Sequence, residues 1–526
     1  MDTRSSWKPL HFAAESGDVE AARRLVAENP AAVRARDDGG RTPLYVAAEC
    51  GRAALARWLV LEGGAAVNAK ARDGRTPLHA AIFGYGRQVS PQEIVEVVRA
   101  LVVDCNANAD ARDDLGRTPL FLTHTLRERG GDHETGAGAA RVLIEEGGAA
   151  VDARTDAGRT PLHGAAEAGD IDLARLLLGH GAAVDAADVH GLTPMHRGVG
   201  NVEMVRMLIV EFGADVNAES GVDGSPLLWA VADDNVEMAR LLVEQGADVS
   251  ARNDDSWTAL HYAALRSFDG ADEPQLIIAQ LLIAHGAEVD AKNAGSTALH
   301  LAARNRNVEI VRALIEGGAA VDLVQEDGWT ALLIAAKFMY LEVARVLIVE
   351  GRADVNIARP DGDSPLHLVS DSLEPDADEC GPEFAELLVR EGGAAVNAQN
   401  IAGMTALHMA ALRDRADVVE VLISEGRAAV NVQDVRGMTA LHYALLADDR
   451  VPGQRTPTKL LDHGAAVDIE NAEGWTPIHQ ACRTVVPNVA LIDRMMRETG
   501  LLITLAQNVV DSHYRRLAKR QRRGGA

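Results

Sequence analysis

The chain is poor in aromatic residues and in positive charge. Phe, Trp and Tyr make up 4% of its 526 residues, so Leu, Ile, Val and Ala have to supply the buried core. Such a composition suits helices that pack closely through small side chains. The formal net charge of −25 argues against a general nucleic-acid binder, because attraction to phosphates needs a basic face.

Cysteine and long apolar runs are also scarce. The four cysteines lie far apart, without the paired spacing of a zinc ribbon or a disulfide framework. No apolar run approaches the ~20 residues that span a bilayer, and the opening MDTRSSWKPLHFAAESGD has no apolar segment of the signal-peptide type. We therefore expect a soluble protein in a reducing compartment, the cytoplasm or alternatively the nucleus.

What is abundant is repetition. The stretch TALHLAARNRNVEIVRALIEGGAAV, from Thr297 to Val321, recurs with variations along the chain. Internal periods of this kind have to be recognised first, because they decide the fold. Alignment on the residue that opens the TPLH-like tetrapeptide predicts fourteen modules, with a unit of about 33 residues and five longer copies, starting at Lys8, Thr42, Thr76, Thr118, Thr160, Thr193, Ser225, Thr258, Thr297, Thr330, Ser364, Thr405, Thr439 and Thr476.

Each module predicts two helices separated and followed by turns. TALHLAARN places Leu, His and Ala on one helical face, and VEIVRALIEGG repeats apolar residues at helical spacing before a glycine that can cap the helix end. The following VDAKNAG is short, polar and rich in turn-forming residues.

The pattern resembles the ankyrin repeat, through T-P-L-H-x-A-A, V-x-x-L-L and G-A-x-V-N/D-A at a period near 33. The resemblance covers about residues 7 to 500. It implies an all-α solenoid of stacked helix-turn-helix units with finger-like turns, beginning with a capping repeat at 7–41. A solenoid also follows from burial, because one helix pair cannot cover its own apolar face.

Five modules carry extra residues, and all five insertions lie between the first and second helices of a module. We interpret them as solvated loops, with a partner-specific contact as the alternative. They are Phe83–Gln92, Arg127–Gly136, Ser267–Gln275, Asp371–Glu383 and Asp448–Pro457.

Ten of the seventeen histidines occupy the fourth position of the tetrapeptide, which favours a structural role over a metal site. The resemblance implies that each imidazole ties neighbouring turns together by hydrogen bonds, while the opening Thr caps the first helix. The ten are His11, His79, His163, His196, His261, His300, His367, His408, His442 and His479.

No other motif predicts catalysis or a cofactor. Turn residues such as Asp73, Asn217, Asp255 and Asn431 form no calcium loop, and we expect them to satisfy the backbone of their own turns. Phosphate-loop, metalloprotease, hydrolase and kinase signatures are missing from the sequence. We expect a non-enzyme without metal, cofactor or small-molecule substrate.

The residue immediately before the opening Thr or Ser, here called the stripe residue, recurs at an equivalent place in every module. Four of the six tryptophans occupy it. Trp and Arg are enriched at binding hot spots, and Met adapts to irregular partners. The alternative is that large residues at this position pack on the adjacent finger. The predicted partner-binding residues are Trp257, Trp329, Trp475, Met404 and Met438, with Arg41, Arg75, Arg117 and Arg159 for an acidic partner segment.

Residues 501–526 predict an amphipathic helix with a basic tail. Leu502, Leu505, Val509 and Leu517 are among the apolar residues that recur there at helical spacing. The basic residues predict an import signal or a contact with an acidic partner, and a solvated helix end is the alternative. They are Arg515, Arg516, Lys519, Arg520, Arg522 and Arg523.

Together these features predict a monomeric scaffold or adaptor that binds a partner protein on its concave face and finger tips. A nuclear regulatory factor or pathway inhibitor, imported through the basic tail, is the alternative. Neither function involves nucleic acid or a membrane.

Overall fold

A computed structural model describes residues 6–83, 89–128, 133–221, 224–265, 273–374, 377–446, 455–482 and 489–499. Throughout these ranges the regular elements are helices, and β-type pairing is limited to two isolated bridges, Ser220 with Gly224 and Asn293 with Ser296. The protein is therefore all-α. Contacts divide the chain into a first unit, Met1–Ala259, and a second unit, Leu260–Ala526.

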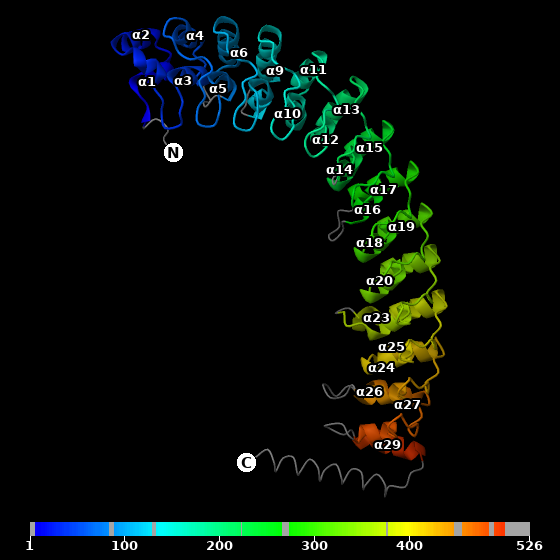
Figure 1. The fold of residues 1–526 in the computed structure, drawn as a ribbon. Helices are drawn as coiled ribbons and strands as arrows, with labels where there is room; N and C mark the ends of the chain where they lie inside the picture. The colour runs from blue at the N-terminus through cyan, green and yellow to red at the C-terminus, as the bar shows by residue number, and fades with distance from the viewer. Residues whose placement is uncertain are drawn as a thin grey trace, which may run out of the picture. The chain divides into compact units, whose positions relative to one another are not determined.

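The first unit stacks helix pairs one on the next (Figure 1). Its elements are α1 (Pro9–Ser16), α2 (Val19–Glu28), η2 (Pro30–Arg34), α3 (Pro43–Glu49), α4 (Ala53–Leu61), α5 (Pro77–Phe83), α6 (Pro91–Arg99), η3 (Ala100–Asp104), α7 (Pro119–Leu122), α8 (Thr125–Glu128), α9 (His133–Arg141), η4 (Val142–Glu146), α10 (Pro161–Ala168), α11 (Ile171–Gly179), α12 (Pro194–Gly198), α13 (Val202–Val210), α14 (Pro226–Ala232) and α15 (Val236–Glu244).

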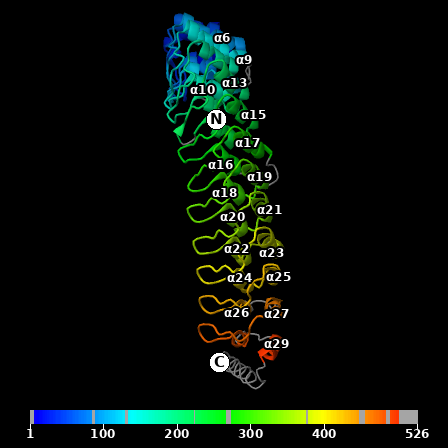
Figure 2. The ribbon, with the colours of Figure 1, turned by 90° about the vertical axis from the view of Figure 1, so that its right-hand side faces the viewer.

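The second unit repeats the arrangement, and its fingers project side by side from one edge (Figure 2). Its elements begin at the boundary with α16 (Ala259–Leu265) and continue with α17 (Glu273–Ala284), α18 (Ala298–Arg304), α19 (Val308–Glu316), α20 (Ala331–Lys337), α21 (Leu341–Arg345), η6 (Val346–Glu350), α22 (Pro365–Asp371), α23 (Ala377–Glu386), η7 (Leu387–Glu391), α24 (Ala406–Leu412), α25 (Ala416–Ser424), α26 (Ala440–Leu446), α27 (Arg455–Asp462), α28 (Pro477–Ala481) and α29 (Val489–Thr499).

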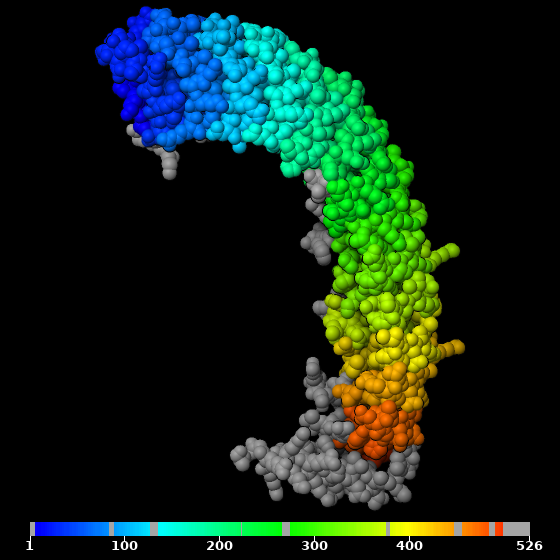
Figure 3. Space-filling view, in the orientation of Figure 1, coloured from blue at the N-terminus to red at the C-terminus, as the bar shows by residue number. Residues whose placement is uncertain are grey.

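The first helix of a module is almost wholly buried, because neighbouring modules cover it on both sides. In α20 every residue from Ala331 to Ala336 is buried. It contacts α18 of the preceding module and α22 of the following one. Burial of one Leu or Ile side chain stabilises the fold by roughly 1.5–3 kcal/mol, so each module depends on its neighbours. The space-filling view shows neighbouring modules in close contact within each unit (Figure 3).

Four second helices end in a π-helical turn that the sequence analysis did not anticipate. These turns are η3, η4, η6 and η7. In η6 the N–H of Gly351 donates to the carbonyl of Val346, five residues back, at 3.0 Å. A π-turn accommodates one additional residue in a helix.

An amide ladder connects successive modules in the segments that precede the fingers. Asn217 Oδ1 accepts from the N–H of Asp248 at 2.7 Å, and Asn431 Oδ1 accepts from the N–H of Ala466 at 2.7 Å. The expectation that these two side chains serve their own turns was therefore wrong. Asp73 does follow it, because its Oδ1 accepts from the N–H of Arg75 at 3.2 Å. For Asn217 and Asn431 the donor is a backbone N–H of the next module, in Asp248 and Ala466 respectively.

The insertions lie where the sequence predicted, between the two helices of a module. Part of each falls outside the described residues, as do residues 501–526 with the predicted amphipathic helix and basic tail. Where described, the insertions contain the start of the second helix: α9 begins at His133 within the second insertion, and α23 begins at Ala377 within the fourth. The number of repeats and the extent of the solenoid domain stay predictions.

Candidate protein-interaction surface

The described fingers are five-residue turns that end at the stripe residue, except the four-residue finger 293–296. In the finger 434–438 the N–H of Asp434 donates to the carbonyl of Met438, and the N–H of Gly437 to the carbonyl of Asp434, both at 2.9 Å. Asp434 Oδ1 accepts from the N–H groups of Arg436 and Met438, both at 2.8 Å. Gly437 has a φ of 72°, which favours glycine. The finger is therefore held by its first residue.

The tetrapeptide histidine fixes the stripe residue of the next module. His442 Nδ1 accepts from the N–H of Thr439 at 3.1 Å, and His442 Nε2 donates to the carbonyl of Trp475 at 3.0 Å. An N–H can only donate and a carbonyl only accepts, which assigns the neutral Nε2–H tautomer. The predicted linking role of this histidine is confirmed, and the predicted Thr cap is seen in other modules, as where Thr42 Oγ1 accepts from the N–H of Tyr45 at 3.2 Å.

The same link recurs in both units, for example from His11 to the carbonyl of Arg41 and from His408 to that of Met438. Burial lowers the pKa of these histidines, and for His163 it does so to about 4. A proton on Nδ1 would face the donor N–H of the preceding Thr, so geometry and desolvation both favour the neutral ring. Stripe residues that accept this hydrogen bond therefore have fixed backbones.

In the first unit the stripe arginines contact carboxylates of their own chain. Arg41 forms ion pairs with Asp37 at 2.8 Å and Glu49 at 3.5 Å, and Arg117 pairs with Asp113 at 2.7 Å. Burial raises the pKa of Glu49 to about 7, although Arg41 acts in the opposite direction. Charge-assisted hydrogen bonds of this kind are stronger than neutral ones. The structure thus assigns these guanidinium groups a bracing role within the finger.

The remaining two arginines are also engaged. The guanidinium of Arg75 lies 3.6 Å from the ring centroid of Phe83, and its Nε lies 3.8 Å from Asp113. Arg159 pairs with Glu167. Recognition of an acidic partner by this row stays a prediction. It would require a partner carboxylate to compete with the existing pairs.

In the second unit four of the six stripe residues are aromatic or sulfur-containing, and the other two are Ser296 and Asp363. Arg359 stacks on Trp329 at 4.5 Å from the ring centroid, and Trp475 contacts His479 edge-on at 5.8 Å. Met404 and both tryptophans are half-buried, whereas Met438 is 7% exposed. Met438 therefore serves mainly as packing, and its Sδ lies 3.2 Å from Asn471 Nδ2. Trp257, also half-buried, belongs to the first unit.

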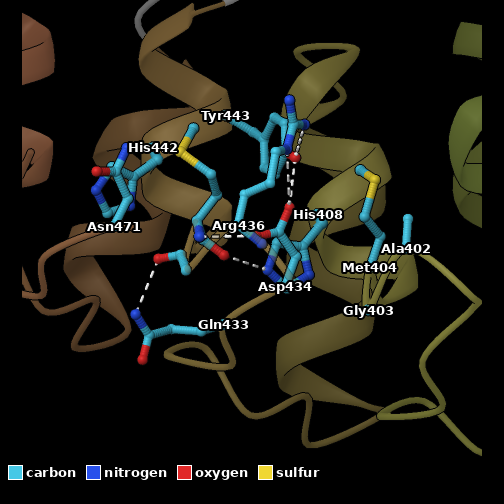
Figure 4. A network of polar contacts seen from close by, with 12 residues as sticks. Ala402, Gly403, Met404, His408, Gln433, Asp434, Arg436, His442, Tyr443 and Asn471 are labelled. Carbon is cyan, nitrogen blue, oxygen red and sulfur yellow. Dashed lines mark hydrogen bonds and ion pairs between the residues drawn. The ribbon is translucent and has the colours of Figure 1, made fainter. Parts of the chain in front are cut away.

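A network around Asp434 was missed by the sequence analysis (Figure 4). Tyr443 Oη donates to Asp434 Oδ2 at 2.6 Å, and the guanidinium of Arg436 contacts Tyr443 Oη. Burial raises the pKa of Tyr443, and the hydrogen bond to Asp434 acts in the same direction. The available signal was a tyrosine directly after the tetrapeptide histidine and nine residues after the acid that opens the finger.

The described residues contain no group of three or more His, Cys, Asp or Glu side chains placed to hold a metal ion. Cys50, Cys105, Cys380 and Cys482 form no disulfide with one another. None of the helices in the described ranges is long and apolar enough to cross a membrane.

Two family models match the chain over most of its length. The model described as ankyrin repeats in three copies matches residues 1–71, 87–188, 133–220, 212–293 and 270–359. The model described as ankyrin repeats in many copies matches residues 387–444. The matches span both units, and each contains stripe residues of the kind described above.

Among curated proteins, the chain is similar to parts of larger ones. It is 25% identical over 260 residues to the NAD-dependent deacetylase sir2B of Dictyostelium discoideum, covering 49% of this chain and 27% of that protein. It is 31% identical over 247 residues to the putative palmitoyltransferase ZDHHC13 of Danio rerio, covering 47% and 30%. It is 42% identical over 83 residues to protein phosphatase 1 regulatory subunit 27 of Mus musculus, covering 16% and 51%. The chain thus spans less than a third of the first two.

Proposed function

The chain belongs to the ankyrin-repeat family, and from this premise we propose that it is a non-catalytic scaffold or adaptor that binds a partner protein through stripe residues and finger tips on its concave face. Ankyrin repeats are typically interaction domains, and they imply protein partners. We further propose that it acts as a monomer in the cytoplasm, without a cofactor, small-molecule substrate, nucleic acid or membrane.

The observation that carries the proposal is the fixed stripe. The backbone of Trp475 is held from two modules, by Asn471 and His442, and those of Trp257 and Trp329 are held within their own fingers by Asn253 and Gln325. The three half-buried tryptophans therefore present aromatic surface without much further ordering. Pre-organisation of this kind strengthens binding because less conformational entropy is lost. Large aromatic side chains are the residues that most often dominate a protein interface.

The relatives support an interaction role more than a catalytic one. Two of them are named as enzymes, but the matches cover under a third of each, as expected for a shared repeat region. The third is named as a regulatory subunit of a phosphatase, and the match covers about half of it. Their activities and partners are not carried over to this chain.

The test is a pull-down from cell lysate with the full chain. The Trp257→Ala, Trp329→Ala, Trp475→Ala triple variant should lose specific partners that the wild type retains, by tenfold or more. Trp58→Ala is the matched control, because Trp58 lies on α4, a second helix away from the stripe, and its Nε1 bonds Glu62. Equal recovery of every partner from the triple variant contradicts the proposed site.

The alternative proposal, a nuclear regulatory factor or pathway inhibitor, draws its support from the basic residues between Arg515 and Arg523. Their density is typical of nuclear import signals. Deletion of Tyr514 to Ala526 from a fluorescently tagged chain should then move the protein from the nucleus to the cytoplasm. An unchanged distribution removes this alternative and leaves the scaffold proposal intact.

A further inference from the structure

Four consecutive fingers of the second unit present an apolar residue at the same place, directly after the residue that opens the finger. These residues, called the fingertip row, are Pro360, Ile401, Val435 and Ala472, and all four are exposed. The side chains of Ile401 and Val435 are the most prominent, at 76% and 71% exposure. Scattered exposed apolar residues are ordinary. Equivalent positions in adjacent modules instead form a line.

Backbone hydrogen bonds hold the row in register. The N–H groups of Ile401, Val435 and Ala472 donate to the carbonyls of Asp361, Ala402 and Arg436 in the preceding fingers, at 3.0, 3.1 and 2.8 Å. A side chain at Gly403 would approach the N–H of Val435 to 2.8 Å, so this glycine permits the close contact between fingers. The row is a rigid edge rather than a set of independent loops.

The charge around the row is negative. Glu326 and Asp327 lie on the finger before Pro360, and Glu470 and Glu473 lie beside or on the finger of Ala472; all four are exposed. None of the four forms an ion pair with another described residue. The two nearby cations are already engaged, Arg359 with Asp361 and Trp329, and Arg436 with Tyr443. An apolar line with acidic ends complements an apolar segment with basic ends.

The spacing narrows the conformation of that segment. Packed helices lie about 8–10 Å apart, and the fingers share the repeat of the helix pairs that carry them. A polyproline II helix has three residues per turn and a rise of about 3.1 Å, so residues i and i+3 lie on one side about 9 Å apart. A β-strand repeats at about 7 Å. An amphipathic α-helix buries a broad stripe, whereas this row is one side chain wide.

We propose that the fingertip row docks an extended partner segment in the polyproline II conformation, with apolar residues at every third position and Lys or Arg at both ends. The inference rests on the proposed scaffold function and names its partner class. Trp329, on the finger before Pro360, and Trp475, on the finger of Ala472, lie at the two ends of the row. Polyproline II segments bind along aromatic-lined surfaces.

The experiment measures fluorescence anisotropy of a labelled peptide, with four Leu-Pro-Pro repeats flanked by two lysines at each end, against the full chain. A second peptide of the same composition has its leucines in irregular register. The Ile401→Ser, Val435→Ser double variant is compared with Val349→Ser, whose side chain is 53% exposed on η6 of the same unit. The expected result is register-dependent binding that weakens tenfold or more in the double variant and stays unchanged in Val349→Ser.

Other outcomes overturn the inference. Equal binding of the irregular peptide would show that charge attraction alone holds the peptide. Tighter binding of a basic amphipathic helix would show that the row binds a helix and not a polyproline II segment. If light scattering shows a wild-type dimer that the double variant abolishes, the row binds a second copy of the chain. Absence of peptide binding also overturns it, and the tryptophan pull-down still reports on the scaffold function. If the Trp329→Ala, Trp475→Ala variant loses peptide binding and the fingertip variant does not, the peptide binds the stripe and not the fingertip row.

Discussion

The two units use the same backbone to present different chemistry. In the first unit four stripe residues are arginines, and the fingertip positions include the charged Asp38, Arg72, Asp114 and Asp156 and one exposed apolar residue, Val189. In the second unit the stripe carries Trp329, Met404, Met438 and Trp475 beside Ser296 and Asp363, and the fingertips after Glu326 are apolar. The hydrogen bonds that hold each finger are alike in both, for example from Asp37 to Arg41 and from Asn471 to Trp475.

The comparison shows that a stripe residue can either brace the module or remain available to a partner. Arg117 contacts the buried carboxylate of its own finger, so its charge is already neutralised. In the second unit the corresponding bond to the finger acid comes from Tyr443 instead, which leaves the stripe residue Met438 without a charge to satisfy. Because Tyr443 bonds the acid of this finger, the stripe residue Met438 does not have to.

The largest expected effect is on the first unit's brace. Asp113→Ala removes the buried acceptor of Arg117 and leaves a half-buried guanidinium without its partner. Loss of one member of a buried pair costs about 3–5 kcal/mol, which should lower the free energy of unfolding of this region. Urea unfolding followed by hydrogen exchange measures it. Asp114→Ala, at the exposed fingertip, is the control, and equal effects from both variants would refute the brace.

Acid should weaken both units, because the histidine link is common to them. The folded pKa of His163 is lowered to about 4, below the 6.5 of the unfolded chain, so the unfolded state takes up a proton first. The contribution of neutral His163 to the free energy of unfolding is fully present above about pH 6.5. It decreases as the pH falls and is lost below about pH 4. The loss is on the order of 3 kcal/mol for His163. A His163→Gln variant should show a shallower pH dependence, and an unchanged dependence would exclude this link.

A smaller effect is expected from Tyr443→Phe, which tests the second unit's brace. The change keeps the ring and removes the O–H that bonds Asp434 Oδ2, leaving that buried oxygen without this donor. The expected cost is about 1–2 kcal/mol, measured as a shift in the urea midpoint. Tyr340→Phe is the control, because its hydroxyl has no hydrogen bond to another described residue. Equal midpoints for both variants would show that the network around Asp434 does not stabilise the second unit.

The smallest effect on stability is expected at the fingertip row. Ile401→Ser and Val435→Ser remove exposed side chains, and surface substitutions of this kind usually stay within about 0.5 kcal/mol. Thermal unfolding of the single variants checks this. A loss above about 1.5 kcal/mol in either variant would show that the row packs within the chain, and would blur the contrast with the first unit.

Sequence periodicity predicted the helix pairs, the Thr caps and the linking histidines, because each depends on residues at fixed spacing within a module. The π-helical turns were not predicted, since a single additional residue gives no local signal of where the helix accommodates it. The amide ladder through Asn217 and Asn431 was assigned to the wrong turn. Short-range and inter-module acceptors look identical in a sequence.

The sequence by itself determined that the chain repeats, that each repeat is a helix pair with a polar turn, and which residue types line up along the stripe. Only the tertiary structure decided which of those residues contact other residues of the same chain. It placed Arg41 and Arg117 against buried carboxylates, buried Met438 and left Ile401 and Val435 exposed. The reason is physical. The spacing of the repeat specifies the backbone position of each stripe residue, whereas the groups that its side chain contacts are brought there by folding, as Glu49 at the end of α3 is brought to Arg41.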